Sequence, residues 1–100
     1  MRLHEIATAR AGDKGNTSQI AVIARESAAY ELIREKLTTD VVAGVFADIA
    51  KGPVTRHEAP GLFAFVFLLE GALGGGVSIS LASDPHGKSL SSLMLGIELD

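Results

Sequence analysis

The residues best suited to chemistry lie together in one short segment, residues 10–17, with the sequence Arg-Ala-Gly-Asp-Lys-Gly-Asn-Thr. We expect strands on both sides of it and therefore interpret it as a connecting loop. Glycines adopt positive φ angles at little cost, which lets successive backbone N–H groups converge on an anion. A guanidinium adds a planar pair of donors for a carboxylate or phosphate. The segment is a candidate anion-binding loop formed by Arg10, Gly12, Asp13, Lys14, Gly15 and Asn16.

A purely structural interpretation of this segment is also open. In it, Asp13 pairs with Arg10 or Lys14 and only holds a tight turn. The segment is not the phosphate-binding loop of nucleotide hydrolases, because that loop has Gly-x-x-x-x-Gly-Lys-Ser/Thr ahead of a helix. Here the segment leads into a predicted strand.

Two later segments are further candidates. The triplet Gly74, Gly75 and Gly76 would let a ligand or another backbone approach closely, or it only ends a helix. Residues 84–88, Asp-Pro-His-Gly-Lys, place an acid, an imidazole and an amine close together, as acid–base chemistry requires. Their order also fits a type I turn without any function. We therefore count Asp84 and Lys88 as ligand-binding candidates and assign no catalytic residue.

The composition bounds the class of protein. The chain has 100 residues, 47% of them hydrophobic, and we expect one domain over residues 1–100. A net charge of −3 argues against nucleic-acid binding. The absence of cysteine excludes disulfides and thiolate chemistry. The three histidines lack metal-binding spacing, so we expect neither a metal nor a cofactor.

The location and the assembly follow from the same composition. The first residues lack the apolar core of a signal peptide, so we expect a cytoplasmic protein. The apolar residues after position 59 are interrupted by glycines and serines, so we expect no membrane span. The apolar content is high for so short a chain, which predicts a homo-oligomer or a partner protein.

The hydrophobic pattern predicts the elements. We expect strands at 2–8, 17–24, 77–82 and 93–99, an edge strand at 54–58, and a turn at 84–87. Ser27 caps a predicted helix over 28–37, and Thr38 or Thr39 caps a second that reaches Ile49. Residues 62–73 have features of both a strand and a buried helix, and we predict the helix. The order predicts an α+β sandwich with a mainly antiparallel sheet and helices on one face.

Three stretches together resemble a known family: Ala9–Thr17, Leu69–Gly76 and Ser80–Lys88. They are similar to the small ferredoxin-like domain at the C-terminal end of acyclic terpene utilisation (AtuA-type) proteins, which also occurs as a free-standing chain of about this length. The resemblance implies a ferredoxin-like two-layer sandwich with an additional strand. The matching positions are the six residues of the first segment and Gly74, Gly75, Gly76, Asp84, Gly87 and Lys88.

The resemblance also implies a role in the catabolism of terpenoids or branched acyl-CoA compounds, with no defined reaction for the domain itself. Two positions depart from the family, since Ala11 stands where serine is common and Val66 replaces a polar amide. Our first hypothesis is an accessory domain that binds an anionic small molecule, such as a carboxylate or an acyl-CoA. The second is an interaction module that binds a larger AtuA-type chain or itself. The third is a small enzyme that uses Asp13 or His86 with Lys14.

Overall fold

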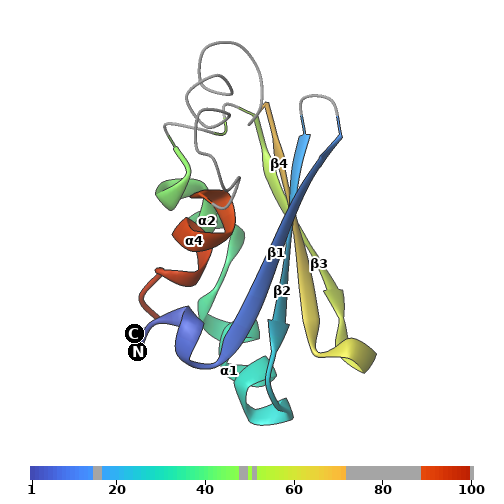
Figure 1. Cartoon of the computed structure of the whole chain (residues 1–100), viewed down its shortest axis with the longest axis vertical. Helices are drawn as coiled ribbons and strands as arrows, with labels where there is room; N and C mark the ends of the chain where they lie inside the picture. The colour runs from blue at the N-terminus through green and yellow to red at the C-terminus, as the bar shows by residue number, and fades with distance from the viewer. Residues whose placement is uncertain (15–16, 48–49, 51, 72–88, 100) are drawn as a thin grey trace.

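The computed structural model describes residues 1–14, 17–47, 50, 52–71 and 89–99. These residues form a twisted sheet with helices on one of its faces (Figure 1). The arrangement is the α+β, ferredoxin-like sandwich that the sequence predicts.

The sheet has four strands in the order β1-β2-β4-β3, and each neighbouring pair is antiparallel. The strands are β1 (Ala7–Lys14), β2 (Thr17–Ala24), β3 (Val54–Ala59) and β4 (Ala64–Glu70). Side chains alternate between the two faces of a strand. In β2, Ser18, Ile20, Val22 and Ala24 are buried while the residues between them are half-buried or exposed. This alternation distinguishes an inner face, which the helices cover, from an outer face.

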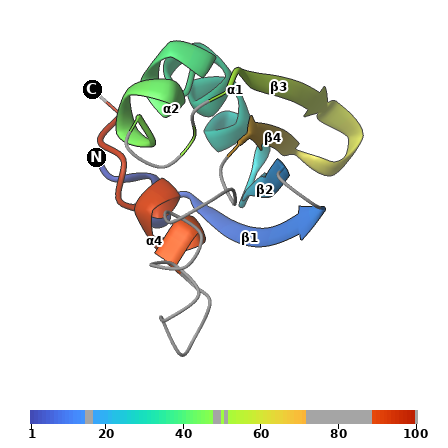
Figure 2. The same ribbon diagram turned by 90° about the horizontal axis from the view of Figure 1, so that it is seen from above.

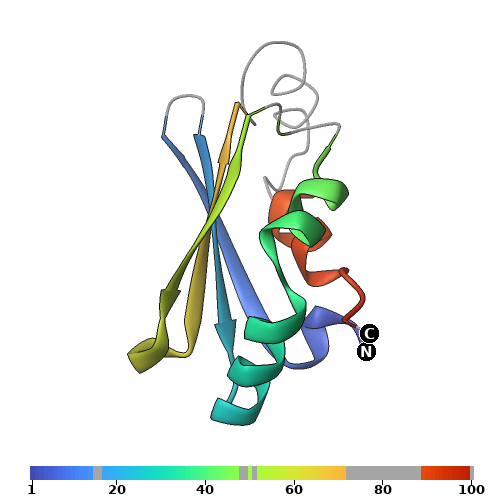
Figure 3. The ribbon, with the colours of Figure 1, turned by 180° about the vertical axis from the view of Figure 1, so that it is seen from behind.

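Three α-helices lie against the inner face, and none covers the outer face within the described chain (Figures 2 and 3). They are α1 (Ser27–Lys36), α2 (Thr39–Val45) and α4 (Ser89–Leu95). Short 3-10 helices, η1 (Leu3–Glu5) and η2 (Pro60–Leu62), precede β1 and join β3 to β4. The core between sheet and helices is closely packed, and its fully buried large side chains include Ile33, Phe46, Phe65, Phe67 and Met94.

Several predictions of the sequence are confirmed. The strand at 17–24 is central, and the strand at 54–59 lies at an edge. Thr38 caps α2, because its Oγ1 accepts a hydrogen bond from the backbone N–H of Val41 at 3.2 Å. The two helices begin and end close to the predicted residues, although α2 stops at Val45 and Glu26 rather than Ser27 is the N-cap of α1.

The predicted strand at 2–8 is wrong in its bounds. Residues 3–5 form η1, and the strand runs from Ala7 to Lys14. The reason is local: the backbone N–H of Arg2 donates to Glu5 Oε2 at 2.8 Å, which closes a tight turn.

The predicted helix at 62–73 is also wrong, because residues 64–70 form β4 between β2 and β3. Phe65, Phe67 and Leu69 are fully buried on its inner face. Their neighbours Val66 and Leu68 are apolar too and lie half-buried on the outer face. A strand that is apolar on both faces shows no alternation, so its sequence resembles a buried helix.

The predicted strand at 93–99 is wrong, because residues 89–95 form α4. Leu90 and Met94 lie one helical turn apart and are buried in the core. The helix ends where the backbone N–H of Gly96 donates to Ser92 and Leu93. Among the described residues, the isolated bridge Arg2↔Glu98 is what remains of the strand pairing there. The predicted strand at 77–82 and the predicted turn at 84–87 lie outside the described residues.

Candidate functional site

The segment 10–17 is for the most part not a loop. Arg10, Gly12, Asp13 and Lys14 belong to β1, and Thr17 begins β2. Arg10 pairs with Ala21, Gly12 with Gln19, Asp13 with Ser18 and Lys14 with Thr17. The connection is therefore only Gly15 and Asn16, which lie outside the described residues. The loop was predicted because the residues of this part of β1 are small or polar. Such residues suit an edge strand as well as a loop.

The conformational role that we expected for Gly12 is wrong. Its φ is not positive, and a Cβ built on it meets no atom within 4 Å. The neighbouring hydroxyl of Ser18, which is fully buried, donates to the Gly12 carbonyl over a long 3.4 Å. Gly12 is thus an ordinary strand residue, and its contact with a ligand stays a prediction.

Arg10 lies exposed on the outer face of the sheet. Within the described chain its guanidinium makes no ion pair and no side-chain hydrogen bond. The side chains of Asp13 and Lys14 lie outside the described ones, so the structural alternative, in which Asp13 pairs with Arg10 or Lys14, stays a prediction. The guanidinium of Arg10 itself is exposed to a group from outside.

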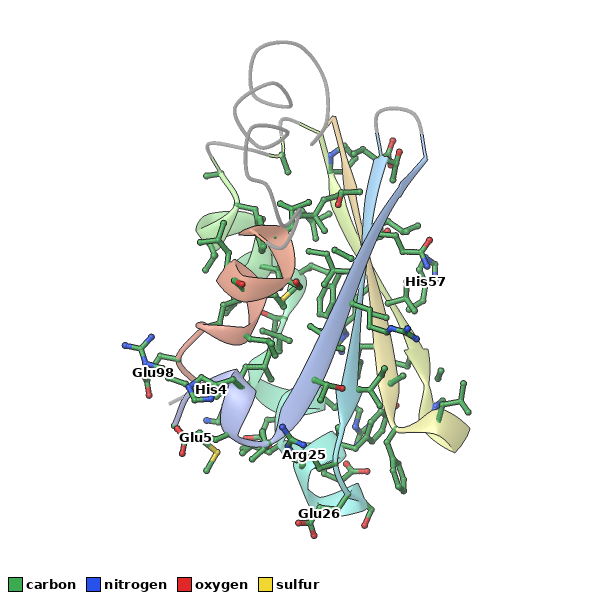
Figure 4. All side chains as sticks on the ribbon, in the orientation of Figure 1. His4, Glu5, Arg25, Glu26, His57 and Glu98 are labelled. Atoms are coloured by element: carbon green, nitrogen blue, oxygen red, sulfur yellow. The ribbon has the colours of Figure 1, made fainter. Side chains whose placement is uncertain are left out.

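The strand register places residues from distant parts of the sequence in one row across the outer face. Arg10 on β1 is opposite Ala21 on β2, Ala21 is opposite Val66 on β4, and Val66 is opposite His57 on β3. His57 is exposed and points away from the helices (Figure 4). A guanidinium and an imidazole therefore lie at the two ends of a row whose middle is apolar.

The rows on either side repeat this arrangement. The next row has Gln19 and Leu68 in the middle and Thr55 at its β3 end, and the row beyond Ala21 has Ile23 and Ala64 in the middle. We call the residues Ala21, Ile23, Val66 and Leu68 the apolar strip; all four are half-buried, although no described element covers them. Polar residues on β1 and β3 border the strip: Thr8, Arg10, Thr55 and His57.

The inner face carries a charged residue that the sequence analysis did not single out. Arg56 on β3 donates from its Nη1 to the backbone oxygens of Arg34 at 3.0 Å and Leu37 at 2.9 Å, at the C-terminal end of α1. Its guanidinium lies 5.1 Å from the centre of the Phe65 ring. Arg56 therefore holds the end of α1 against the edge of the sheet.

Tyr30 completes this contact. Its ring stacks on Phe65 with centroids 4.6 Å apart, and its hydroxyl donates to Glu58 Oε1 at 3.3 Å. Burial raises the pKa of Tyr30 above its usual value, and the nearby Glu58 carboxylate raises it further. The tyrosine is 5% exposed, so these groups brace the fold and do not face a ligand. No spacing in the sequence indicates this cluster, because its members come from α1, β3 and β4.

The remaining predicted site residues cannot be placed. Gly15, Asn16, Gly74, Gly75, Gly76, Asp84 and Lys88 lie outside the described residues, as does His86. Of the described residues, no three histidines or acids are close enough to hold a metal ion.

A surface hollow of about 380 Å³ lies elsewhere, along α1, and is lined by Glu31, Leu32, Arg34 and Glu35. Glu31 and Arg34 form an ion pair at 2.6 Å there. No predicted site residue contributes to it. No described helix is both long and apolar enough to span a membrane.

Comparison with protein families identifies the family of this chain. The model of the AtuA ferredoxin-like domain matches residues 1–100. Comparisons with curated proteins and with solved structures gave no match.

Proposed function

The chain belongs to the AtuA ferredoxin-like domain family, and from this we propose that it is an accessory interaction domain whose outer sheet face binds a partner protein. The partner that we propose is a larger AtuA-type chain that acts in the breakdown of terpenoid or acyl-CoA compounds. The proposal assigns the domain no reaction of its own.

The single observation that carries this proposal is the row Arg10–Ala21–Val66–His57. Protein interfaces combine an apolar centre with a polar rim, and arginine is enriched in them. The apolar strip and its polar borders have this arrangement. A sheet needs a second layer on only one face, and here the helices already supply it. The apolar side chains of the outer face are thus not required by the core of the domain.

Val66 supports this proposal. It lies in the middle of the outer face, half-buried between Ala21 and His57. A polar side chain at this position would be solvated without disturbing the inner face. A valine here adds apolar surface that no described element of the chain covers, as at a site of external contact.

Site-specific photo-crosslinking tests the proposal. A photoreactive residue is placed at Gln19 or Thr55, which are exposed on the outer face, and at Glu35, which is exposed on α1 as the control. In cells that also express a larger AtuA-type chain, we expect an adduct with that chain from the two outer positions and none from Glu35. An adduct from Glu35 alone, or from no position, would contradict the proposal. An adduct of twice the 10.4 kDa chain would indicate self-association instead.

A second candidate function is the binding of a small anion, a carboxylate or an acyl-CoA, and the free guanidinium of Arg10 favours it. Calorimetric titration with short-chain carboxylates and acyl-CoAs tests this function. We expect heat of binding that disappears in Arg10→Ala and persists in Arg34→Ala, which removes an exposed arginine on α1. A flat titration of the unmodified protein would reject this candidate.

A further inference from the structure

We propose that the element docking on the outer face is one amphipathic helix, with acidic residues along both sides of its apolar stripe. This inference rests on the proposed function and specifies the partner's contribution. It follows from the dimensions of the apolar strip, from its borders and from its charge.

The width of the strip fits one helix. Neighbouring strands lie about 4.8 Å apart, so β1 and β3, three spacings apart, are separated by roughly 14 Å. A helix with its side chains is roughly 10–12 Å wide. A helix seated over β2 and β4 therefore fills the space between Arg10 and His57 and leaves both side chains beside it.

The length and the floor of the strip fit as well. The rows of Ile23, Ala21 and Leu68 follow one another at about 6.7 Å, which is two residues of a strand, so the strip is roughly 13 Å long. A helix of two to three turns covers that length. Ala21 and Ala64 have small side chains, which lets a helix approach the sheet closely.

The charges around the strip select acidic flanks. Arg10 borders it on β1 and His57 on β3, and both are exposed. Glu70, the exposed acid of β4, lies past Leu68 at the end of the strip. A helix with Glu or Asp on both sides of its apolar stripe would pair with Arg10 and hydrogen-bond to His57. A helix with lysines there would place like charges against Arg10.

The size of the face argues against a second copy of this chain as the occupant. Four strands of about seven residues give a projected area of roughly 400 Å². A stable interface buries about 800 Å² on each partner. A two-fold dimer built on this face alone uses the same patch on both subunits and falls short of that area. A helix that belongs to a larger chain is one part of a contact that extends beyond this face.

Two synthetic peptides test the inference on the whole chain. Both are about 18 residues long, or five turns, and have the same Leu/Ala stripe; one has glutamate on both flanks and the other lysine. Titration is followed by the amide NMR spectrum of the labelled protein. We expect the glutamate peptide to shift the amides of β2 and β4 and the lysine peptide to shift them much less.

Two charge reversals of equal size complete the design. Arg10→Glu should weaken binding of the glutamate peptide by about fivefold or more, whereas Arg34→Glu, an exposed position on α1, should change it less than twofold. Equal binding of the two peptides, shifts confined to the helical side, or no binding would overturn the helix proposal. If the crosslinks at Gln19 and Thr55 form nonetheless, the proposed function stands and only the nature of the docking element is wrong.

Discussion

Arg56 offers the sharpest test of how the fold is held together. Its side chain is 18% exposed and joins three parts of the structure: the last turn of α1, the ring of Phe65, and Glu58 on its own strand at 3.4 Å. Replacement by alanine removes these contacts at once and leaves the carbonyls of Arg34 and Leu37 without this donor.

The expected loss follows from the individual contacts. A hydrogen bond from a charged donor contributes about 1.5–3 kcal/mol, and a cation over an aromatic ring adds about 0.5–1 kcal/mol when partly exposed. Water can reach the end of a helix and replace part of each contact. We therefore expect Arg56→Ala to lower the free energy of unfolding by about 2–3 kcal/mol. For a domain of this size that loss lowers the melting temperature by roughly 10–20 °C.

Urea unfolding followed by circular dichroism measures this effect. Arg56→Lys keeps the charge but cannot reach both carbonyls with one planar group, so we expect it to recover about half of the loss. Arg25→Ala is the matched control, and it should change the free energy of unfolding by less than about 0.5 kcal/mol. A loss below about 0.5 kcal/mol for Arg56→Ala, or full recovery by lysine, would refute the bridging role.

Three further predictions concern the backbone and one titrating group. Gly71 has a φ of 73°, so Gly71→Ala should lower the free energy of unfolding by about 1–2 kcal/mol. Gly12 lies in extended backbone with open space at its Cβ position, so Gly12→Ala should leave the free energy of unfolding unchanged or raise it by about 0.4–1 kcal/mol. Thr38→Ala should lose about 1 kcal/mol of capping in thermal unfolding, and Thr39→Ala less than about 0.5 kcal/mol. The pKa of Tyr30 is raised in the folded state, so the unfolded chain loses the tyrosine proton at a lower pH than the folded protein does. The contribution of Tyr30 to the free energy of unfolding is therefore intact below pH 10 and falls as the pH rises beyond it. Tyr30→Phe should reduce this fall when the free energy of unfolding is measured with urea at several pH values.

Each of these predictions has a clear contrary result. Equal losses for the two glycine variants would show that φ does not decide their effect. Equal losses for the two threonine variants would mean that the hydroxyl of Thr38 does not cap α2. The chain has one tyrosine, so the absorbance of tyrosinate reports Tyr30 directly. A transition of the folded protein at or below pH 10 would contradict the raised pKa.

The sequence alone predicts those parts of the fold in which each element has its own period. β2 alternates, and the helical period of α1 places Ala29 and Ile33 on one buried side, so the pattern predicts both elements. It does not predict β4, because Val66 and Leu68 make its outer face apolar and remove the alternation. The same outer residues form the apolar strip, so the misleading pattern and the proposed interface have one cause.

The candidate site could be predicted only in part. Arg10 stands out from its neighbours in the sequence, and the structure confirms that it is exposed. Its relation to His57 depends on the strand order β1-β2-β4-β3 and on the register of three pairings, and a single chain's pattern specifies neither. The expected role of Gly12 failed for a similar reason, since glycine in a sequence does not distinguish a turn from an edge strand.

The two ends of the described chain are joined by a short ladder. The backbone N–H of Leu3 donates to Ile97 at 2.9 Å, and that of Leu99 donates to Met1 at 2.8 Å. The two ends consequently lie side by side and are paired in antiparallel directions (Figure 1). If the domain were inserted into a loop of another protein, the two ends of that loop would stay close together. If the domain were pulled by its two ends, the hydrogen bonds between the ends would break one after another. The sheet would bear none of the initial force.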